Sequence, residues 1–555
     1  MDMNVRIAGE AGQGVQTTGE LLVGALAKMG FHVLSTQVYM SRIRGGLNSY
    51  DIRFGDAELH SARRKADILV ALNEEALDTL AADVEAGGAV FFDGKAEKPY
   101  VGIGFTRAAK ETGGSAVMAN TVAAGAVFAR LGYDVEALVQ YLAVEFKKKG
   151  SDVVEKNAAC ARRGGQLAVE AGVAAVNAPK SVGAPGRVYS GTEAVGLSAA
   201  LSGVKFVASY PMTPSTGVFT FLAGAADKYG IVVEQAEDEI AAINMVCGAT
   251  YGGVVAMTTT SGGGFALMCE GLSLAGMHEL PAFVFLSQRP GPATGLPTRT
   301  GQEDLQFAIR AGHGEFVRAV YAPGTIEECY ELTRLGVETA HKYQTPVILL
   351  ADQYLVDLRK NIPPLDETYK AIDRHIKEDA GEDYMRYAVT ESGVSPRAVP
   401  GGSAFVVLDS DEHTADGHIT ENLDVRVEMV DKRLRKGRGL IEDVVPPARY
   451  GAEGAGHLII SWGSTYGPCR EAVDILRTRG VEVEMLHFSQ VWPINTEAVK
   501  KAVGKRSRVT VVEGNATGQF AGLLREAGAI GECEKILKYN GLAFAGEEIA
   551  EEVSK

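Results

Sequence analysis

The sequence lacks the cysteine pairs that hold metal clusters. Six cysteines are present among 555 residues, and none stands in a Cys-x-x-Cys pair. The chain therefore has no spacing typical of an iron–sulfur or zinc site, and we expect no metal-binding site in it. The cysteines are expected to be reduced and mostly buried, as small apolar residues are. They are Cys160, Cys247, Cys269, Cys329, Cys469 and Cys533.

Long hydrophobic runs are also missing. No uninterrupted apolar run approaches the ~20 residues that span a bilayer, which argues against a membrane-spanning helix. The first residues, MDMNVRIAGEAGQG, contain none of the basic, apolar and small-residue segments of a signal peptide. We therefore expect a cytoplasmic protein that has no membrane partner.

Positively charged residues are fewer than negatively charged ones. The chain has 55 lysines and arginines against 70 aspartates and glutamates, which gives a net charge of −15. Because nucleic-acid binding requires clustered cations to neutralise phosphates, a nucleic-acid partner is not expected. The short basic stretches at 146–150 and 431–439 are interpreted as solvated faces.

What the sequence does contain is a regular alternation of elements. Apolar runs of five to seven residues alternate with segments of helical periodicity, a pattern typical of parallel sheets covered by helices. The length is too great for one core. We predict an α/β fold with three open, mostly parallel-sheet domains. Their ranges are 1–176, 188–360 and 453–555, with a linker at 177–187.

The strands of the second and third domains are readable directly. In the second domain they are expected in VKFVASY, IVVEQ, VVAMTTT, AFVFLSQ and TPVILLAD, and in the third in HLIISWGS, VEVEMLHF, RVTVVEGN and KILKYN. Between these domains, residues 361–452 are rich in charge, Gly and Pro. We predict that this segment is an irregular excursion that serves function or an interface.

The N-terminal sequence carries a glycine loop. Glycines 9, 12 and 14 in GEAGQG follow a strand and precede a helical segment, which suits a backbone loop near an anion. The spacing differs from the dinucleotide pattern G-x-G-x-x-G, and no acid ends the second strand, so nicotinamide binding is not favoured. A tight turn and a phosphate site are both open interpretations. RIRGGLNS, which contains Arg44, is either an anion anchor or a surface turn.

The second domain has a stiff polar corner in VKFVASYPMTPSTG. Pro211 and Pro214 fix their own φ and push the residues before them, Tyr210 and Thr213, toward extended geometry. Ser215 or Thr216 is expected to cap the following helix. Ligands of open parallel sheets bind beyond the carboxyl ends of the strands, so this corner is a candidate ligand contact.

Three further strand ends carry polar residues. The acids 237–239, the segment TTTSGGG, and SQRPGPATGLPTRT with two arginines follow successive strands. Acids at a helix start are favourable for dipole reasons alone. The convergence of hydroxyls, acids, glycines and arginines nevertheless predicts a site for an anionic ligand and a heteroaromatic cofactor.

These motifs resemble a known enzyme family. YPMTPS, EDEIAAINMVCGA, TTTSGGG and GLPTRTGQEDL are similar to the alpha subunit of 2-oxoacid:ferredoxin oxidoreductases, thiamine-diphosphate enzymes of anaerobic metabolism. AGEAGQG with RIRGGLNS resembles their gamma domain, fused here at the N-terminus. HLIISWGSTYG and VVEGNATGQF resemble their transketolase C-terminal-like domain. The fused arrangement resembles the 2-oxoglutarate-type members most.

The resemblance implies a pyrimidine-binding domain at 188–360 and a catalytic glutamate within it. In thiamine enzymes a glutamate hydrogen-bonds the aminopyrimidine ring and stabilises its imino form. Counting back nine residues from Gly248 in VCGA assigns this role to Glu239, although Glu237 and Asp238 leave room for a slip in the count. A buried carboxyl in this role should have a raised pKa.

The resemblance also implies the remaining site residues. Thr213 matches the threonine that contacts the substrate, and Arg299 is assigned to the substrate carboxylate, with Arg289 as the second choice. Further residues are assigned to the bound cofactors. Tyr210, Ser261 and Gly262 join Glu239 in coenzyme binding, and Gly12, Gly14 and Arg44 are placed near coenzyme A.

One expected motif is missing. The G-D-G…N motif, which holds magnesium and the diphosphate in this superfamily, does not occur in the 555 residues. The resemblance therefore implies a beta subunit that carries this motif and the cysteines of a [4Fe-4S] cluster, in an α2β2 assembly that reduces ferredoxin. Asp411, His413, Asp416 and His418 mimic metal ligands, but turn chemistry is the preferred interpretation.

The implied reaction is oxidative decarboxylation. A 2-oxoacid, here 2-oxoglutarate, and coenzyme A give acyl-CoA and carbon dioxide with reduction of ferredoxin, and the reverse direction is accessible. Two alternatives stay open at this point. One is an indolepyruvate or branched-chain 2-oxoacid oxidoreductase subunit, and the other is a non-catalytic electron-transfer subunit that binds coenzyme A or a nucleotide.

Overall fold

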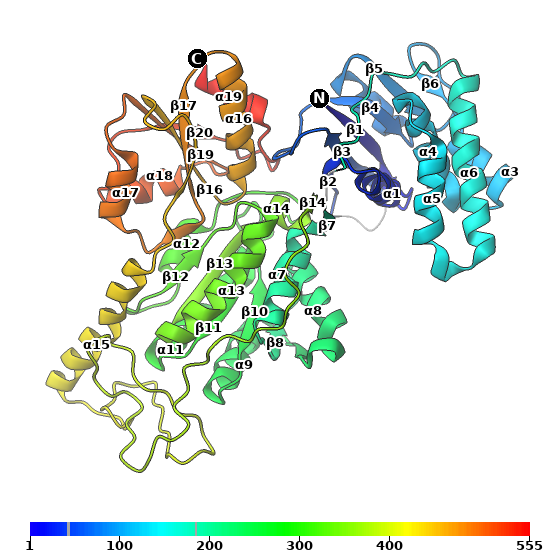
Figure 1. The fold of residues 1–555 in the computed structure, drawn as a ribbon. Coiled ribbons are helices and arrows are strands. Elements are labelled where there is room, and N and C mark those ends of the chain that lie inside the picture. Colours follow the sequence, from blue (N-terminus) through cyan, green and yellow to red (C-terminus); the bar gives the residue numbers. More distant parts are fainter. Residues whose placement is uncertain (42–44, 184–185) are drawn as a thin grey trace. The chain divides into compact units, whose positions relative to one another are not determined.

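The structure is a computed structural model that describes residues 1–41, 45–183 and 186–555 (Figure 1). Contacts divide the chain into two compact units. The first comprises Met1–Tyr189, Asp357–Pro364 and Ala545–Glu547, and the second comprises Ser190–Val356, Leu365–Phe544 and Glu548–Lys555. Three open sheets, mostly parallel and flanked by helices, confirm the predicted α/β class.

The first unit is built on a mixed sheet of eight strands in the order β6-β5-β4-β1-β3-β2-β14-β7. The pairs among β1, β4, β5 and β6 are parallel, whereas β2, β3 and β14 pair antiparallel. The strands are β1 (Asp2–Ala11), β2 (His32–Val38), β3 (Gly45–Gly55), β4 (Ala66–Ala71), β5 (Val84–Phe92), β6 (Val101–Gly102), β7 (Arg187–Ser190) and β14 (Arg359–Ile362).

The helices of this unit are rich in small residues, which lets them pack closely. A Cβ added to Gly125 would lie 2.0 Å from the carbonyl oxygen of Ala161, and one added to Gly164 would lie 1.9 Å from that of Val122. Helices α4 and α6 therefore meet backbone to backbone. The helices are α1 (Val15–Lys28), α2 (Glu74–Leu80), α3 (Phe105–Gly113), α4 (Ala119–Leu131), α5 (Val135–Glu145) and α6 (Ser151–Glu170), with short 3-10 turns at Ala81–Asp83, Ala116–Met118 and Lys147–Lys149.

The second unit contains a seven-stranded sheet in the order β18-β12-β13-β11-β10-β8-β9. Every pair is parallel except the edge pair of β12 and β18. The strands are β8 (Phe206–Ser209), β9 (Val232–Gln235), β10 (Ala256–Thr260), β11 (Ala282–Gln288), β12 (Ala319–Tyr321), β13 (Pro346–Asp352) and β18 (Gln490–Trp492). All five strands expected here are confirmed.

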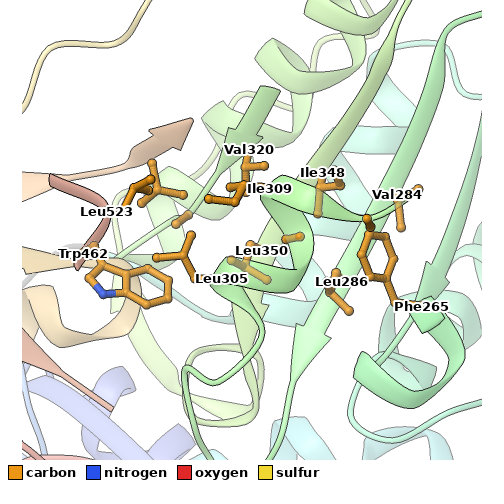
Figure 2. Packing of buried hydrophobic residues seen from close by; sticks show 14 of the residues in the cluster. Phe265, Val284, Leu286, Leu305, Ile309, Val320, Ile348, Leu350, Trp462 and Leu523 are labelled. Atoms are coloured by element: carbon orange, nitrogen blue, oxygen red, sulfur yellow. The ribbon is translucent and has the colours of Figure 1, made fainter. Parts of the chain in front are cut away.

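Helices cover both faces of this sheet. Successive side chains of β11 point to opposite faces. Val284 joins a core that includes Phe265 (Figure 2). On the other face, Phe283 contacts Gly336 of α13. This explains why β11 is apolar without alternation. The helices are α7 (Gly191–Leu201), α8 (Thr216–Tyr229), α9 (Glu239–Tyr251), α10 (Gly262–Leu267), α11 (Cys269–Met277), α12 (Leu305–Arg310), α13 (Ile326–Tyr343) and α14 (Gln353–Asp357).

The third sheet, also in the second unit, has the order β15-β17-β16-β19-β20. Its core is continuous with that of the seven-stranded sheet, because Trp462 and Leu523 lie in the same buried cluster as Leu305 and Val320 (Figure 2). The elements are β15 (Ala448–Gly451), β16 (His457–Trp462), β17 (Val483–Phe488), β19 (Arg508–Glu513), β20 (Glu534–Leu537), α16 (Tyr466–Thr478), α17 (Thr496–Val503), α18 (Gln519–Glu526) and α19 (Gly546–Val553), with a 3-10 turn at Gly463–Thr465. The four strands expected here are confirmed.

The segment 361–452 differs from its predicted irregular character. It contains the twenty-residue helix α15 (Leu423–Glu442), although turns and isolated bridges occupy residues 363–422 (Figure 1). The helix escaped prediction because its buried side includes lysines. Lys432 and Lys436 both pair with the buried Glu279, and Arg386 donates to the carbonyl oxygen of Glu279 at 2.7 Å. The irregular stretch and α15 are thus fixed to the sheet by a buried ionic cluster.

None of the helices among the described residues is both long and apolar enough to cross a bilayer.

Candidate active site

Four strand ends meet at one edge of the seven-stranded sheet. Strands β11, β10, β8 and β9 are neighbours in that order, and each neighbouring pair is parallel. The segments that follow these strands therefore begin at the same edge. This topology explains the convergence that the sequence predicts. It brings together the YPMTPS corner, the acids, the glycine run and the first arginine.

The corner after β8 is stabilised by a hydrogen bond between two of its own residues. The Ser215 hydroxyl donates to the carbonyl oxygen of Met212 at 2.7 Å. Ser215 occupies the N-cap position of α8 but makes no side-chain capping bond there, so the expected cap is wrong. Its hydroxyl stabilises the corner instead. The side chain of Tyr210, at the start of this corner, is 40% exposed.

Among the three acids at the start of α9, the structure singles out Glu239. Glu237 is exposed, and Asp238 is the N-cap, whose carboxylate accepts from the Ala241 N–H at 2.7 Å. Glu239 is only 3% exposed, and its Oε1 has no hydrogen-bond partner among the described residues. Burial raises the pKa of Glu239, and the charge of Asp238 raises it further.

The glycine run after β10 makes room for this carboxyl. A Cβ added to Gly264 would lie 2.3 Å from Glu239 Oε1 and 2.4 Å from Thr260 Oγ1. The hydroxyl of Ser261 in the same turn is buried and has no partner among the described residues. A buried carboxyl oxygen and a buried hydroxyl thus lie at the strand ends without partners among the described residues, which fits a ligand that supplies hydrogen bonds to both.

The two arginines occupy different places. Arg289 follows β11, and its Nη1 donates to the carbonyl oxygen of Thr213 at 2.8 Å. Arg299 lies farther along the same loop, and a Cβ added to Gly541 would approach its Cβ to 3.1 Å. Each has a buried nitrogen without a partner in the described part of the chain, and burial lowers the pKa of each guanidinium. The structure brings Arg289 against the Thr213 corner.

Asp304 is a further polar residue at this edge, and sequence reasoning gave it no role. Burial raises its pKa to about 6, the charge of Glu303 adds to the rise, and Arg289 opposes it. Asp304 Oδ2 is buried without a hydrogen-bond partner among the described residues. The only sequence signal was an acid close behind the arginine-bearing loop, in GQEDL.

The N-terminal glycine loop belongs to the first unit. Gly12 and Gly14 have φ of 92° and 83°, values that favour glycine. A Cβ on Gly14 would lie 2.1 Å from Asn120 Oδ1, whereas nothing lies within 4 Å of a Cβ on Gly12. The loop is tight and leaves open space at Gly12. Arg44 lies outside the described residues.

The acid and histidine cluster of the long excursion forms turns. His418 Nδ1 lies 3.1 Å from a carboxylate oxygen of Asp416, and His413 Nδ1 lies 3.0 Å from the carbonyl oxygen of Asp411. These are local contacts between residues two apart. No group of three or more metal-ligating side chains is present in the described parts of the chain.

Comparison with protein families matches nearly the whole chain. The profile for "Pyruvate flavodoxin/ferredoxin oxidoreductase, thiamine diP-bdg" matches residues 198–432. The profile for "Pyruvate ferredoxin/flavodoxin oxidoreductase" matches residues 4–167, and that for "Pyruvate:ferredoxin oxidoreductase core domain II" matches residues 455–547.

Full-length relatives and a solved structure agree with these matches. The 2-oxoacid:ferredoxin oxidoreductase subunit alpha of a Sulfolobus species is 31% identical over 99% of this chain and 96% of its own. The 2-oxoglutarate oxidoreductase subunit KorA of Mycobacterium tuberculosis is 29% identical over 98% and 90%. The 2-oxoglutarate:ferredoxin oxidoreductase of Magnetococcus marinus, solved with 2-oxoglutarate, coenzyme A and succinyl-CoA bound, is 32% identical with a TM-score of 0.93, covering 100% of this chain and 99% of its own.

Proposed function

This chain belongs to the family of 2-oxoacid:ferredoxin oxidoreductases as a thiamine-diphosphate-dependent alpha subunit, and we propose that it acts on 2-oxoglutarate through a site centred on Glu239. The observation that carries the proposal is the buried Glu239 Oε1, which has no partner among the described residues and lies against the glycine run. Bound thiamine diphosphate would supply a carbon nucleophile and an electron sink.

The residues of this chain fit that coenzyme. Glu239 would accept a hydrogen bond from the pyrimidine ring, and burial raises the pKa of its carboxyl, which suits a group that shares a proton with the ring. The pyrimidine ring would be lined by residues that follow strands at the same edge of the sheet, namely Ser261, Gly262 and Tyr210. Closure of the site against water would strengthen the hydrogen bond of Glu239.

Thr213 and Arg289 are the proposed substrate contacts. Arg289 takes precedence over Arg299 because its guanidinium already contacts the Thr213 corner and keeps a buried Nε without a partner among the described residues. A planar guanidinium binds a carboxylate bidentately. Arg299 remains the second candidate, since it too has a buried nitrogen without a partner in the described chain.

The preference for 2-oxoglutarate rests on relatives. The Magnetococcus marinus enzyme was solved with 2-oxoglutarate, coenzyme A and succinyl-CoA, and the Mycobacterium tuberculosis relative is named a 2-oxoglutarate oxidoreductase. We propose that this chain shares that substrate, acylates coenzyme A and catalyses the reaction in both directions. Gly12 and Gly14, with Arg44, are the proposed coenzyme A contacts of the first unit.

The rest of the active site is assigned to another polypeptide. The sequence has no G-D-G motif and no Cys-x-x-Cys pair. A beta subunit would therefore hold magnesium, the diphosphate and a [4Fe-4S] cluster, and it would pass electrons to ferredoxin from an α2β2 assembly in the cytoplasm.

The test of substrate is a comparison of three 2-oxoacids. The complex of this chain with its beta subunit is assayed for coenzyme A-dependent reduction of ferredoxin with 2-oxoglutarate, pyruvate and 2-oxoisovalerate. We expect kcat/KM to be at least about tenfold higher for 2-oxoglutarate, because it alone of the three has a second carboxylate, which a buried cation other than Arg289, such as Arg299, would bind. A preference for 2-oxoisovalerate would assign the chain to the branched-chain class instead.

A further inference from the structure

Asp304 is fixed to the end of β11 by its backbone and not by its side chain. Its N–H donates to Gln288 Oε1 at 3.0 Å. Asp304 occupies the N-cap position of α12, yet its carboxyl makes no capping bond. An aspartate at such a position ordinarily accepts from the first turn of the helix. Here the carboxyl is left for another partner.

The glycine run beside Asp304 has a carboxyl at each end. A Cβ added to Gly262 would lie 2.5 Å from Asp304 Oδ2, and one added to Gly264 would lie 2.3 Å from Glu239 Oε1. Neither glycine has a φ in the left-handed region, so space and not backbone conformation requires glycine. Asp304 thus lies at the same strand ends as the proposed coenzyme contact Glu239.

Asp304 faces a positive charge that it does not bond. The charge of Arg289, in the loop after β11, lowers the pKa of Asp304, whereas the charge of the adjacent Glu303 raises it. Gln288 and Gly262, which also contact Asp304, are neutral, and Glu239 lies across the glycine run. Yet Asp304 Oδ2 and Arg289 Nε are both buried without a hydrogen-bond partner among the described residues. Buried groups of this kind are ordinarily satisfied, by protein or by ligand.

We propose that Asp304 is a second carboxyl of the substrate site, which in its neutral form donates a hydrogen bond to the 2-oxoacid carboxylate held by Arg289. The inference rests on the proposed function. An ionised Asp304 would repel a carboxylate in this place, whereas a carboxylic acid bonds strongly to one. Substrate binding above the pKa of Asp304 is therefore accompanied by uptake of one proton from solvent.

The sign of the pH effect follows from this proton. Burial raises the pKa of free Asp304 to about 6. Below that pH the carboxyl is already neutral and binding costs no proton. Above it each unit of pH makes the proton tenfold scarcer, so KM for the 2-oxoacid rises about tenfold per pH unit until the pKa of the substrate complex is reached.

The experiment is a pH series of KM for 2-oxoglutarate in the complete complex, from about pH 5.5 to about pH 8.5. Wild-type KM is expected to be flat below about pH 6 and to rise above it. Asp304→Asn, which keeps the shape and an N–H donor, should make KM independent of pH within about twofold. Glu303→Gln is the matched control, since loss of its charge lowers the pKa of Asp304 and moves the rise to lower pH without removing it.

Two results would overturn the inference. One is a wild-type KM that does not rise with pH, which needs no variant and is independent of whether Asp304→Asn folds. The other is a rise that persists unchanged in Asp304→Asn. Failure of the proposed function looks different, because a wild-type complex that turns over no 2-oxoacid at any pH contradicts the reaction and not the role of one carboxyl.

Discussion

At the residue scale, the proposed site depends on a buried carboxyl, one oxygen of which has no hydrogen-bond partner among the described residues. Glu239 begins a helix directly after Asp238 has taken the capping position. Asp238 thus caps the helix, and the side chain of Glu239 faces the glycine run instead. Under the proposed function, capping of the helix by Asp238 leaves the carboxyl of Glu239 available to the coenzyme.

Replacement of Glu239 is the first test of this role. We expect Glu239→Gln to lower kcat of the complex at least about 100-fold, because an amide cannot exchange a proton with the coenzyme. The exposed neighbour provides the control, and Glu237→Gln should keep kcat within about twofold. A fully active Glu239→Gln complex would favour the non-catalytic electron-transfer reading of this subunit.

The glycine run offers a steric test of the same contact. In Gly264→Ala the new methyl group would lie 2.3 Å from Glu239 Oε1, so the carboxyl must move. Overpacking of this kind costs about 1–3 kcal/mol of stability, and we expect a loss of activity with a lowered melting temperature. Gly263→Ala is the matched control in the same helix, since its Cβ would meet nothing closer than 3.9 Å. Equal activity in both variants would contradict the assigned contact.

The sequence could identify Glu239 as a candidate but could not separate it from its neighbours. Spacing from Gly248 pointed to it, while the burial that favours it over its neighbours depends on the packing of Gly264 from another strand end. Asp304 escaped for the same reason, because its burial against Gly262 is not visible in the local sequence GQEDL. The order of Arg299 and Arg289 as substrate contacts likewise stays a prediction, and the contact between Arg289 and Thr213, which favours Arg289 in the proposal, is not visible in the sequence.

At the scale of elements, strands were predictable and α15 was not. The buried parallel strands are apolar on both sides, which gives a strong local signal. Helix α15 buries Lys432 and Lys436 on its inner side, and this is acceptable only because Glu279 is buried opposite them. Such a compensation joins residues more than 150 positions apart, so no local pattern reveals it.

Removal of the shared acid tests this compensation. We expect Glu279→Gln to destabilise the docking of α15 by about 3–5 kcal/mol, because two buried lysines lose their counter-charge. Hydrogen exchange measured by mass spectrometry should show increased exchange across Leu423–Glu442.

An exposed ion pair supplies the control for this measurement. Glu497 pairs with Lys500 on the surface of α17, and loss of such a pair costs at most about 1 kcal/mol. Glu497→Gln should therefore leave the exchange of α15 unchanged. Unchanged exchange in Glu279→Gln as well would mean that apolar packing alone holds this helix.

At the scale of the whole molecule, the proposed function has the chain supply groups for one end of the coenzyme, and the sequence lacks the G-D-G motif for the other. Glu239 and the glycine run fit a pyrimidine, whereas the G-D-G motif that holds magnesium and diphosphate is missing from the sequence. The net charge of −15 has a related consequence. An acidic ferredoxin would be repelled by most of this surface, so we expect electrons to leave through the partner.

Coenzyme affinity tests this dependence on a partner. We expect the isolated chain to bind thiamine diphosphate with magnesium at least about 100-fold more weakly than the complex does. This difference corresponds to about 2.7 kcal/mol, which charge-assisted contacts between the partner and the diphosphate readily supply. Isothermal titration calorimetry on the isolated chain and on the complex measures the difference. Equal affinity would place the diphosphate site within this chain, and the beta subunit would then be required for electron transfer alone.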